Sequence, residues 1–179
     1  MGKKEKKCYI SSRVLLEMVR DECAKEQERG NNLDNKSGFF ITVILAVATI
    51  FVPIIPLEKI LSVYQFGVCV QKCCISVMLF CVIISFLLLI GAFRSLYEAY
   101  KLTDYMHPDL SIIDNEGYHI LHPDRIEKGL CDHYKTIVCF NRDVNNRKCD
   151  AITLGIKMCS VGFVILIVST VGMKIIIGG

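Results

Sequence analysis

The chain has 179 residues, of which 53% are hydrophobic and 22% charged, with a formal net charge of +3 and no tryptophan. Most of the hydrophobic residues fall in three stretches of roughly membrane-spanning length, which excludes an ordinary soluble domain. The small net charge, with acids mixed among the bases, gives no indication of nucleic-acid binding. We predict an all-α integral membrane protein with three transmembrane helices and a small cytoplasmic helical bundle.

The first predicted element is a polar N-terminal segment, residues 1–36, with a helix over residues 9–33. Beyond Asp21 almost every side chain of this helix is polar or charged. Such a helix usually needs a partner surface, and we expect residues 94–156 to supply it. Its short apolar face consists of Ile10, Val14, Leu15 and Met18.

Three transmembrane helices are predicted, over residues 37–57, 73–93 and 157–177. The first two have 21 residues each without a charge, which as helices cover about 30 Å, the thickness of the hydrocarbon core. The third begins at Lys157 and includes Lys174, and we expect both side chains to extend towards the lipid head groups.

The first span is not expected to be a cleaved signal peptide. A long, mostly polar segment precedes it, and no small-residue cleavage site follows it. Pro53 and Pro56 are expected to kink or end the helix, since each removes a backbone hydrogen-bond donor.

The lysine and arginine counts predict the orientation in the membrane. Nine fall in residues 1–36, two in the connection 58–72 and eight in residues 94–150. Cytoplasmic segments retain the positive charge. We therefore expect the N-terminus and residues 94–156 in the cytoplasm, and the connection 58–72 and the C-terminus outside the inner (plasma) membrane of a bacterium.

The segment 94–156 is expected to begin as an extension of the second span that His107-Pro108 ends. A second helix is predicted to start near Pro123 and to continue into the third span. Its apolar stripe follows a 3.6-residue period and consists of Ile126, Leu130, Ile137, Phe140 and Val144.

Each span also carries a row of small or weakly polar side chains at helical spacing. Small side chains let membrane helices approach closely, because the hydrophobic effect does not drive helices together inside lipid. The rows favour helix–helix packing over the alternative, a pore lined by them in a homo-oligomer. They include Thr42, Ala46 and Thr49 in the first span, Cys81 and Ser85 in the second, and Gly155, Gly162 and Ser169 in the third.

Two polar patches, residues 31–36 and 141–148, mark the places where the chain enters the membrane from its predicted cytoplasmic side. Each patch alone is typical of a solvated membrane edge, although adjacent amides and charges can also bind one another or lipid phosphates. Their recurrence favours contact between them. The candidate interaction or gating residues are Arg29, Asp34, Lys36, Asn141, Asn145, Arg147 and Lys148.

Two short motifs resemble a known family. The first is Glu26-x-Glu28-Arg29 followed by Leu33-Asp34-x-Lys36 and an apolar span. It is similar to the E-x-x-R…L-D-x-K-A pattern of small bacterial membrane proteins of the SLATT and Pycsar transmembrane-effector type. The second, which resembles their closing helix, is Tyr134…Asn141…Asn145-x-Arg147-Lys148.

This resemblance implies a membrane-disrupting effector of anti-phage defence that is gated by a nucleotide signal or by a protein partner. Ser37 stands where the family has alanine, and three spans replace the two of its simplest members. Because the chain has no recognisable sensor domain, such a signal would act on the cytoplasmic helices or arrive through another protein.

Catalytic and metal chemistry have little support in the sequence. There is no Gly-rich phosphate loop, H-E-x-x-H or G-x-S-x-G motif, and ten cysteines divided between spans and cytoplasm do not indicate a disulfide framework. The alternative is zinc, but the spacing of the possible ligands matches no standard finger. We expect no enzyme, metal or cofactor; the possible ligands are His119, His122, Cys131 and His133.

The function expected from these observations is an oligomerising, membrane-disrupting effector in bacterial phage defence. The alternative is a non-catalytic membrane scaffold or accessory subunit that binds a partner through its cytoplasmic helices. The expected partners are the lipid bilayer, further copies of the chain, and a cytoplasmic protein or nucleotide signal, without nucleic acid.

Overall fold

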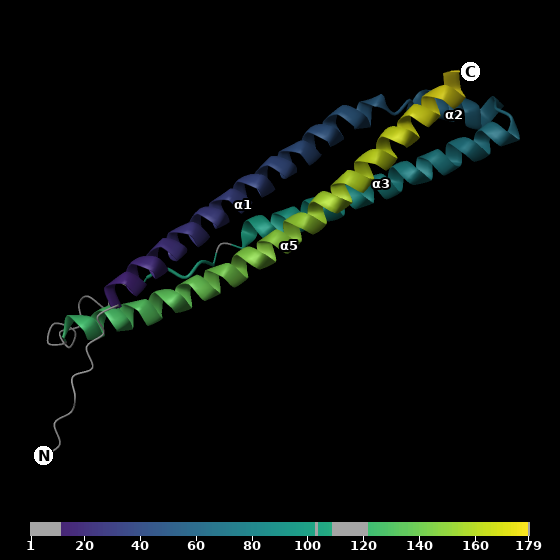
Figure 1. Cartoon of the computed structure of the whole chain (residues 1–179). Helices are drawn as coiled ribbons and strands as arrows, with labels where there is room; N and C mark the ends of the chain where they lie inside the picture. The colour runs from purple at the N-terminus through teal and green to yellow at the C-terminus, as the bar shows by residue number, and fades with distance from the viewer. Residues whose placement is uncertain (1–11, 103, 109–121, 179) are drawn as a thin grey trace, which may run out of the picture. The chain divides into compact units, whose positions relative to one another are not determined.

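The structure, a computed structural model, describes residues 12–102, 104–108 and 122–178. Over these residues the chain forms helices and no strand, which confirms the all-α prediction (Figure 1). The helices are α1 (Ser12–Ile54), α2 (Leu57–Phe66), α3 (Cys69–Lys101) and α5 (Pro123–Gly178).

Three of these helices, α1, α3 and α5, are long and apolar enough to cross a membrane. α3 and α5 contain the second and third predicted spans and α1 contains residues 37–54 of the first, so the described chain has the helices of a multi-pass membrane protein. Both α1 and α5 also extend well beyond their apolar stretches. α5 begins at Pro123, as predicted, because the fixed φ of proline suits the first helical position and its missing N–H is not needed there.

One predicted helix end differs from the structure. α3 ends at Lys101, six residues before His107, where we expected it to end. The backbone N–H and C=O of Met106 instead bond to the side-chain amide of Asn141, which replaces the partners that a continued helix would give them. Part of the predicted helical segment 94–156 is therefore extended chain.

The connection between the first two spans is also more ordered than predicted. Residues Leu57–Phe66 form α2, which follows the end of α1 after two residues. Pro53 lies in the last turn of α1 and Pro56 immediately precedes α2, so the prolines separate the two helices, as expected.

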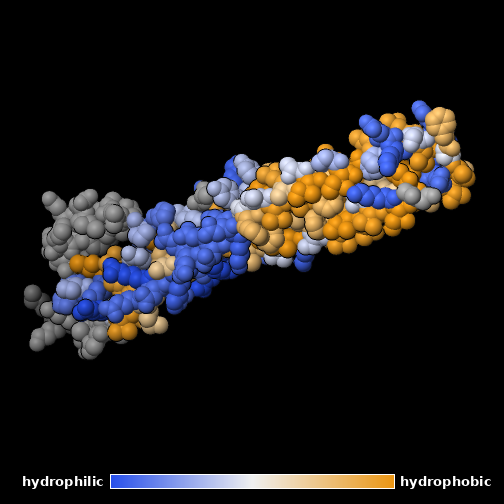
Figure 2. All heavy atoms as spheres, turned by 90° about the horizontal axis from the view of Figure 1, so that it is seen from above, coloured by the Kyte–Doolittle hydropathy of each residue, from blue (hydrophilic) through white to orange (hydrophobic). Residues whose placement is uncertain are grey.

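The chain divides into two compact units. The polar unit consists of the described residues of Met1–Leu33 and Leu102–Arg147, and the apolar unit of those of Asp34–Lys101 and Lys148–Gly179. Figure 2 shows exposed hydrophobic side chains gathered over the apolar unit and hydrophilic ones over the polar unit. An apolar surface of this extent is typical of a surface that contacts lipid.

Small residues bring α3 and α5 together in the apolar unit. A Cβ atom on Gly155 would lie 2.8 Å from the Leu96 Cγ, and one on Gly162 would lie 3.2 Å from the carbonyl oxygen of Ser85. The Ser85 hydroxyl donates to the carbonyl of Gly162. Ser85 is fully buried and Ser169 is 2% exposed, so the small rows of the second and third spans lie inside the unit, with Cys81 half-buried at its margin.

The small row of the first span lies elsewhere. Thr42, Ala46 and Thr49 are exposed, and α1 buries Ile44 and Val47 instead. The hydroxyls of Thr42 and Thr49 donate to the carbonyls of Gly38 and Leu45 on their own helix. With the hydroxyls bonded in this way, the row presents small, apolar side-chain surface. Bulky side chains are buried here because α1 fills space against its neighbours rather than approaching them backbone to backbone.

The glycines of this unit allow a direct test of close packing. Gly155→Ala adds a methyl where Leu96 already lies, and overpacking costs about 1–3 kcal/mol, which offsets the roughly 1 kcal/mol that alanine gains in a helix. Gly38→Ala is the matched control, since its Cβ would meet no other part of the described chain within 4 Å. In denaturant unfolding in detergent micelles, we expect Gly38→Ala to be more stable than the wild type. Gly155→Ala should be as stable as the wild type or less stable. Equal stabilisation by both would contradict close α3–α5 packing.

Candidate functional site

The candidate site lies in the polar unit, where α1 and α5 run side by side in the same direction. Ser12 donates to Glu127 at 2.5 Å, and the Arg20 guanidinium lies 5.6 Å from the centre of the Tyr134 ring. Further along both helices, Arg142 contacts Glu26. The residue numbers of the contacting pairs increase together along the two helices, so α1 and α5 are parallel in this unit.

Apolar side chains cover only part of this contact. Leu16, Ile137 and Val144 are buried, but Phe140 of the predicted stripe is 43% exposed. Asn141, the next residue, is buried in its place. On a 3.6-residue period residue 140 lies slightly closer to the face of Ile126 than residue 141 does, so periodicity favoured Phe140, and the hydrogen bonds of Asn141 select the buried amide instead.

Glu26 is the centre of the site. It is 7% exposed, and Arg142 Nε donates to its Oε1 at 2.9 Å. The Asn145 amide nitrogen donates both to Glu26 Oε2 at 2.9 Å and to the Glu26 backbone carbonyl at 2.7 Å. Arg29 lies 3.4 Å from the same carboxylate. A buried carboxylate is tolerated only with such partners, because its desolvation is otherwise expensive.

The pKa of Glu26 reflects this balance. Burial acts to raise it, but the hydrogen bonds from Asn145 and Arg142, together with the positive charges of Arg29 and Arg142, outweigh burial and lower the pKa of Glu26 below its ordinary value. The carboxylate is therefore charged near neutral pH.

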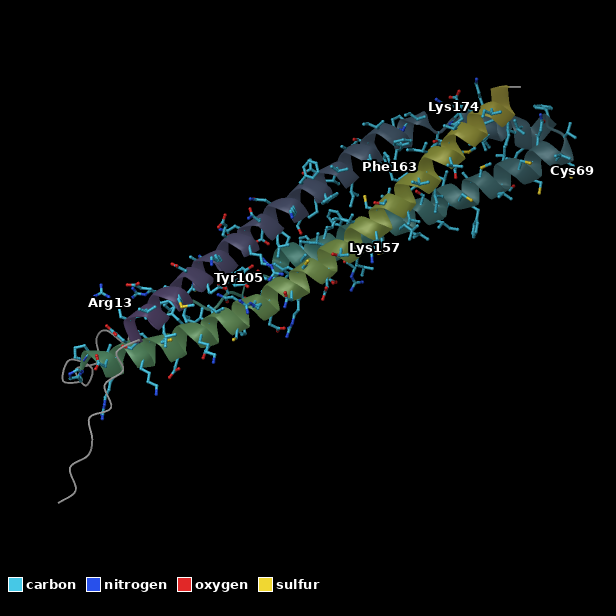
Figure 3. All side chains as sticks on the ribbon, in the orientation of Figure 1. Arg13, Cys69, Tyr105, Lys157, Phe163 and Lys174 are labelled. Atoms are coloured by element: carbon cyan, nitrogen blue, oxygen red, sulfur yellow. The ribbon has the colours of Figure 1, made fainter. Side chains whose placement is uncertain are left out.

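Asn145 also joins α1 and α5 to the chain that follows α3. Asn145 is fully buried, and its Oδ1 accepts from the Tyr105 hydroxyl at 2.7 Å. A Cβ atom on Gly30 would lie 2.7 Å from the Tyr105 Cζ, so only glycine leaves room for this ring. Figure 3 shows Tyr105 beside these helices. Glycine in a helix interior costs about 1 kcal/mol relative to alanine, and here it makes the Tyr105 contact possible.

A second asparagine holds the same segment one turn earlier on α5. The Asn141 amide accepts from the Met106 N–H at 2.9 Å and donates to the Met106 carbonyl at 3.1 Å. The oxygen and the nitrogen of the Asn141 amide thus both bond to the backbone of Met106. We call the set Glu26, Arg142, Asn141, Asn145 and Tyr105 the amide–carboxylate cluster.

The apolar unit contains a separate buried ion pair. Lys148 Nζ lies 2.6 Å from Asp34 Oδ1, and Lys148 is fully buried. This contact brings together residues of the two polar patches. Ser37, one turn further along α1, is 1% exposed, and its hydroxyl has no hydrogen-bond partner among the described residues.

The other predicted residues are distributed as follows. Arg29 donates to Asn146 at 3.0 Å as well as approaching Glu26. Arg147 is exposed and pairs with Asp143 on its own helix at 2.7 Å. Lys36 is exposed. Lys36 and Arg147 therefore do not join the contacts that Arg29, Asp34, Asn141, Asn145 and Lys148 make between helices.

Sequence reasoning missed four members or neighbours of the site: Glu26, Gly30, Tyr105 and Arg142. Glu26 is the first residue of the first family-like motif. The arginine three positions after it, Arg29, is a signal that could have identified Glu26 as a site residue. Gly30 inside a helical segment was a second available signal. Tyr105 lay in a segment expected to be helical, and no local pattern marked it.

The possible zinc ligands that the structure describes are not assembled into a site. In the described residues, no group of three or more His, Cys, Asp or Glu side chains is placed to hold a metal ion, and His119 lies outside those residues. His122 lies 3.4 Å from Asp124, and the Nε2 of His133 is buried with no hydrogen-bond partner in the described part of the chain. The described cysteines, including Cys131, are free thiols.

Comparison with protein-family models, with curated proteins and with solved structures finds no match to this chain.

The charge of Glu26 gives a pH-dependent prediction. Because the pKa of the folded state is lowered, Glu26 adds stability above its ordinary pKa of 4.5, and this stability is lost as the pH falls towards the folded value. At neutral pH, Glu26→Gln should destabilise the polar unit by about 1–2 kcal/mol, the size of a charge-assisted hydrogen bond. The difference from wild type should shrink at pH 3.

Hydrogen exchange of the α1 amides in micelles measures this difference at both pH values. Glu28→Gln is the matched control, since Glu28 is exposed two residues away and should leave exchange unchanged. A pH-independent effect of Glu26→Gln would contradict a charged Glu26 in the folded state.

Ser37 gives a prediction of the opposite sign. A buried hydroxyl without a partner costs about 1–3 kcal/mol of desolvation, so Ser37→Ala should stabilise the protein. Thermal unfolding of the purified protein in detergent is the measurement. Ser62→Ala, which alters an exposed serine on α2, is the control and should have little effect. Destabilisation by Ser37→Ala would mean that the hydroxyl has a partner in the membrane.

Proposed function

We propose that this chain is a bacterial inner-membrane effector that assembles with further copies of itself and compromises the bilayer during phage defence. The orientation proposed has the N-terminus and the polar unit in the cytoplasm and the C-terminus outside. The observation that carries the proposal is the exposed row of Thr42, Ala46 and Thr49 on α1. The resemblance of the two short motifs to transmembrane effectors supplies the defence context.

The α1 row supports assembly because the same chain already uses such rows for packing. Gly155 and Gly162 bring α5 against α3, with Ser85 donating across the contact. Inside lipid, close backbone approach and interhelical contacts drive association, and residues as small as Ala46 permit both. The corresponding row of α1 has no such use within one copy, so it is available to another.

The amide–carboxylate cluster supports a regulated effector. Its α1 member, Glu26, belongs to the same continuous helix as the exposed row, and its α5 members belong to the helix that contains the third span. A nucleotide phosphate or an acidic protein side chain would compete for Arg142 and Arg29, since guanidinium groups bind phosphate and carboxylate in similar ways. Loss of their contact with Glu26 is the proposed activating event.

The proposal is tested by induced expression in bacteria with the neighbouring genes and phage infection supplied. Membrane potential, measured with a voltage-sensitive dye, should collapse with the wild type. Ala46→Leu fills the small row and should abolish the collapse, whereas Val52→Leu adds bulk at another exposed position of α1 and should not. Both variants should be checked for equal amounts in the membrane fraction.

Two results would refute the proposal. One is unchanged membrane potential and growth with the wild type under these conditions. The other is full activity of Ala46→Leu, which would remove the α1 row from the mechanism.

The alternative function, a membrane scaffold or accessory subunit, is favoured by a different observation. Val14 and Met18 of the polar unit are 58% and 60% exposed, with Leu15 between them also exposed. Apolar side chains at these positions could bind a cytoplasmic protein. A stoichiometric partner that co-purifies with the wild type but not with Leu15→Glu, without loss of membrane potential, would favour this function.

A further inference from the structure

α2 exposes an apolar face that the rest of the described chain does not cover. Leu57 and Leu61 are 62% and 63% exposed, and Tyr64 continues the same face at a helical interval. Phe66 is 87% exposed, and the turn that follows adds Val68 at 66%. A patch of this kind at the end of a helix is too apolar for bulk water.

The neighbouring side of α2 is polar. Glu58, Ser62 and Gln65 repeat at intervals of four and three, so they share one face of the helix, and all are exposed. α2 is therefore amphipathic, with an apolar face and a polar face both free of the described chain. This is the pattern of a helix that lies in the plane of a membrane surface.

The chain connections restrict where α2 can lie. It has 10 residues, or about 15 Å of helix, which is too short to cross a bilayer. Two residues join it to the end of α1 and two to the start of α3, and both of those helices are able to span the membrane. α2 must therefore stay at the membrane surface where these helices end.

Contacts with α3 fix the depth of the apolar face. Ile60 is 5% exposed, and the Tyr64 hydroxyl and the Ser76 hydroxyl of α3 share a hydrogen bond. Ser76 lies one turn beyond Lys72, whose carbonyl it also contacts at 2.9 Å. The charge of Lys72 marks the head-group level, so Tyr64 lies just within it, at the depth where tyrosine is enriched in membrane proteins.

We propose that α2 and the turn after it form an in-plane membrane anchor. Leu57 and Leu61 lie among the outermost acyl-chain carbons, and Glu58, Ser62 and Gln65 face the head groups and water. Lipid is the occupant, rather than a second copy or another protein, because α2 is joined at both ends to helices that can span the membrane and is thereby held at the membrane boundary, where the exposed Leu57 and Leu61 meet acyl chains.

The absence of tryptophan from the chain makes a clean experiment possible. Leu61→Trp and Ser62→Trp place a single fluorophore on the two faces of α2, in the full-length protein reconstituted into vesicles of phosphatidylcholine and phosphatidylglycerol. Lipids brominated on the acyl chain quench tryptophan within the bilayer, and iodide quenches tryptophan in water. Leu57→Trp is a second probe of the apolar face, one turn before Leu61.

The expected result is a blue-shifted Leu61→Trp emission that is quenched severalfold more by brominated lipid than by iodide, with Leu57→Trp behaving alike. Ser62→Trp should show the reverse order. Strong iodide quenching of both apolar-face probes would place the face in water and overturn the proposal. Protection from both quenchers would mean that protein covers the face, which also overturns it. Unchanged helicity by circular dichroism verifies that each variant folds.

Discussion

Glu26 places a negative charge between α1 and α5, and the polar unit is built around its neutralisation. Arg142 and Asn145 lie one turn apart on α5, so a single face of that helix supplies both the charge and the amide. A buried ion pair adds little net stability over apolar packing, but removing one partner leaves an uncompensated charge and costs several kcal/mol. Its effect is therefore to fix the register of two parallel helices, and the same Asn145 then positions Tyr105.

The apolar unit is assembled by a different force. Lipid offers no hydrophobic gain for bringing α3 and α5 together, so their contact depends on close backbone approach at Gly155 and Gly162 and on the hydrogen bond from Ser85. The buried ammonium group of Lys148 in this unit is paired with Asp34. Both units thus depend on specific polar contacts. In the polar unit they neutralise the charge of Glu26, and in the apolar unit they hold helices together where the hydrophobic effect does not.

The sequence predicted the helical class and three spans because long uncharged stretches have few other solutions. It predicted the start of α5 at Pro123 from the local chemistry of proline. It missed α2, since a helix of ten residues is stabilised by its surroundings and not by its own pattern. It also missed the early end of α3, which depends on Met106 finding Asn141 far along the chain. Likewise, small residues predicted the packing face of α5 but not that of α1, because spacing does not reveal which neighbour a face meets.

The first motif separates into two groups of residues when placed on α1. Glu26, Leu33 and Asp34 are buried or half-buried on the side that faces partners, and packing explains their chemical types. Glu28 and Lys36 are exposed, and no packing contact requires their charges. A protein that merely needed two parallel helices could dispense with them. Under the proposed function, a signal or partner needs accessible charge, so Glu28 and Lys36 are the members of the motif that it would contact before it competes for Arg29 and Arg142.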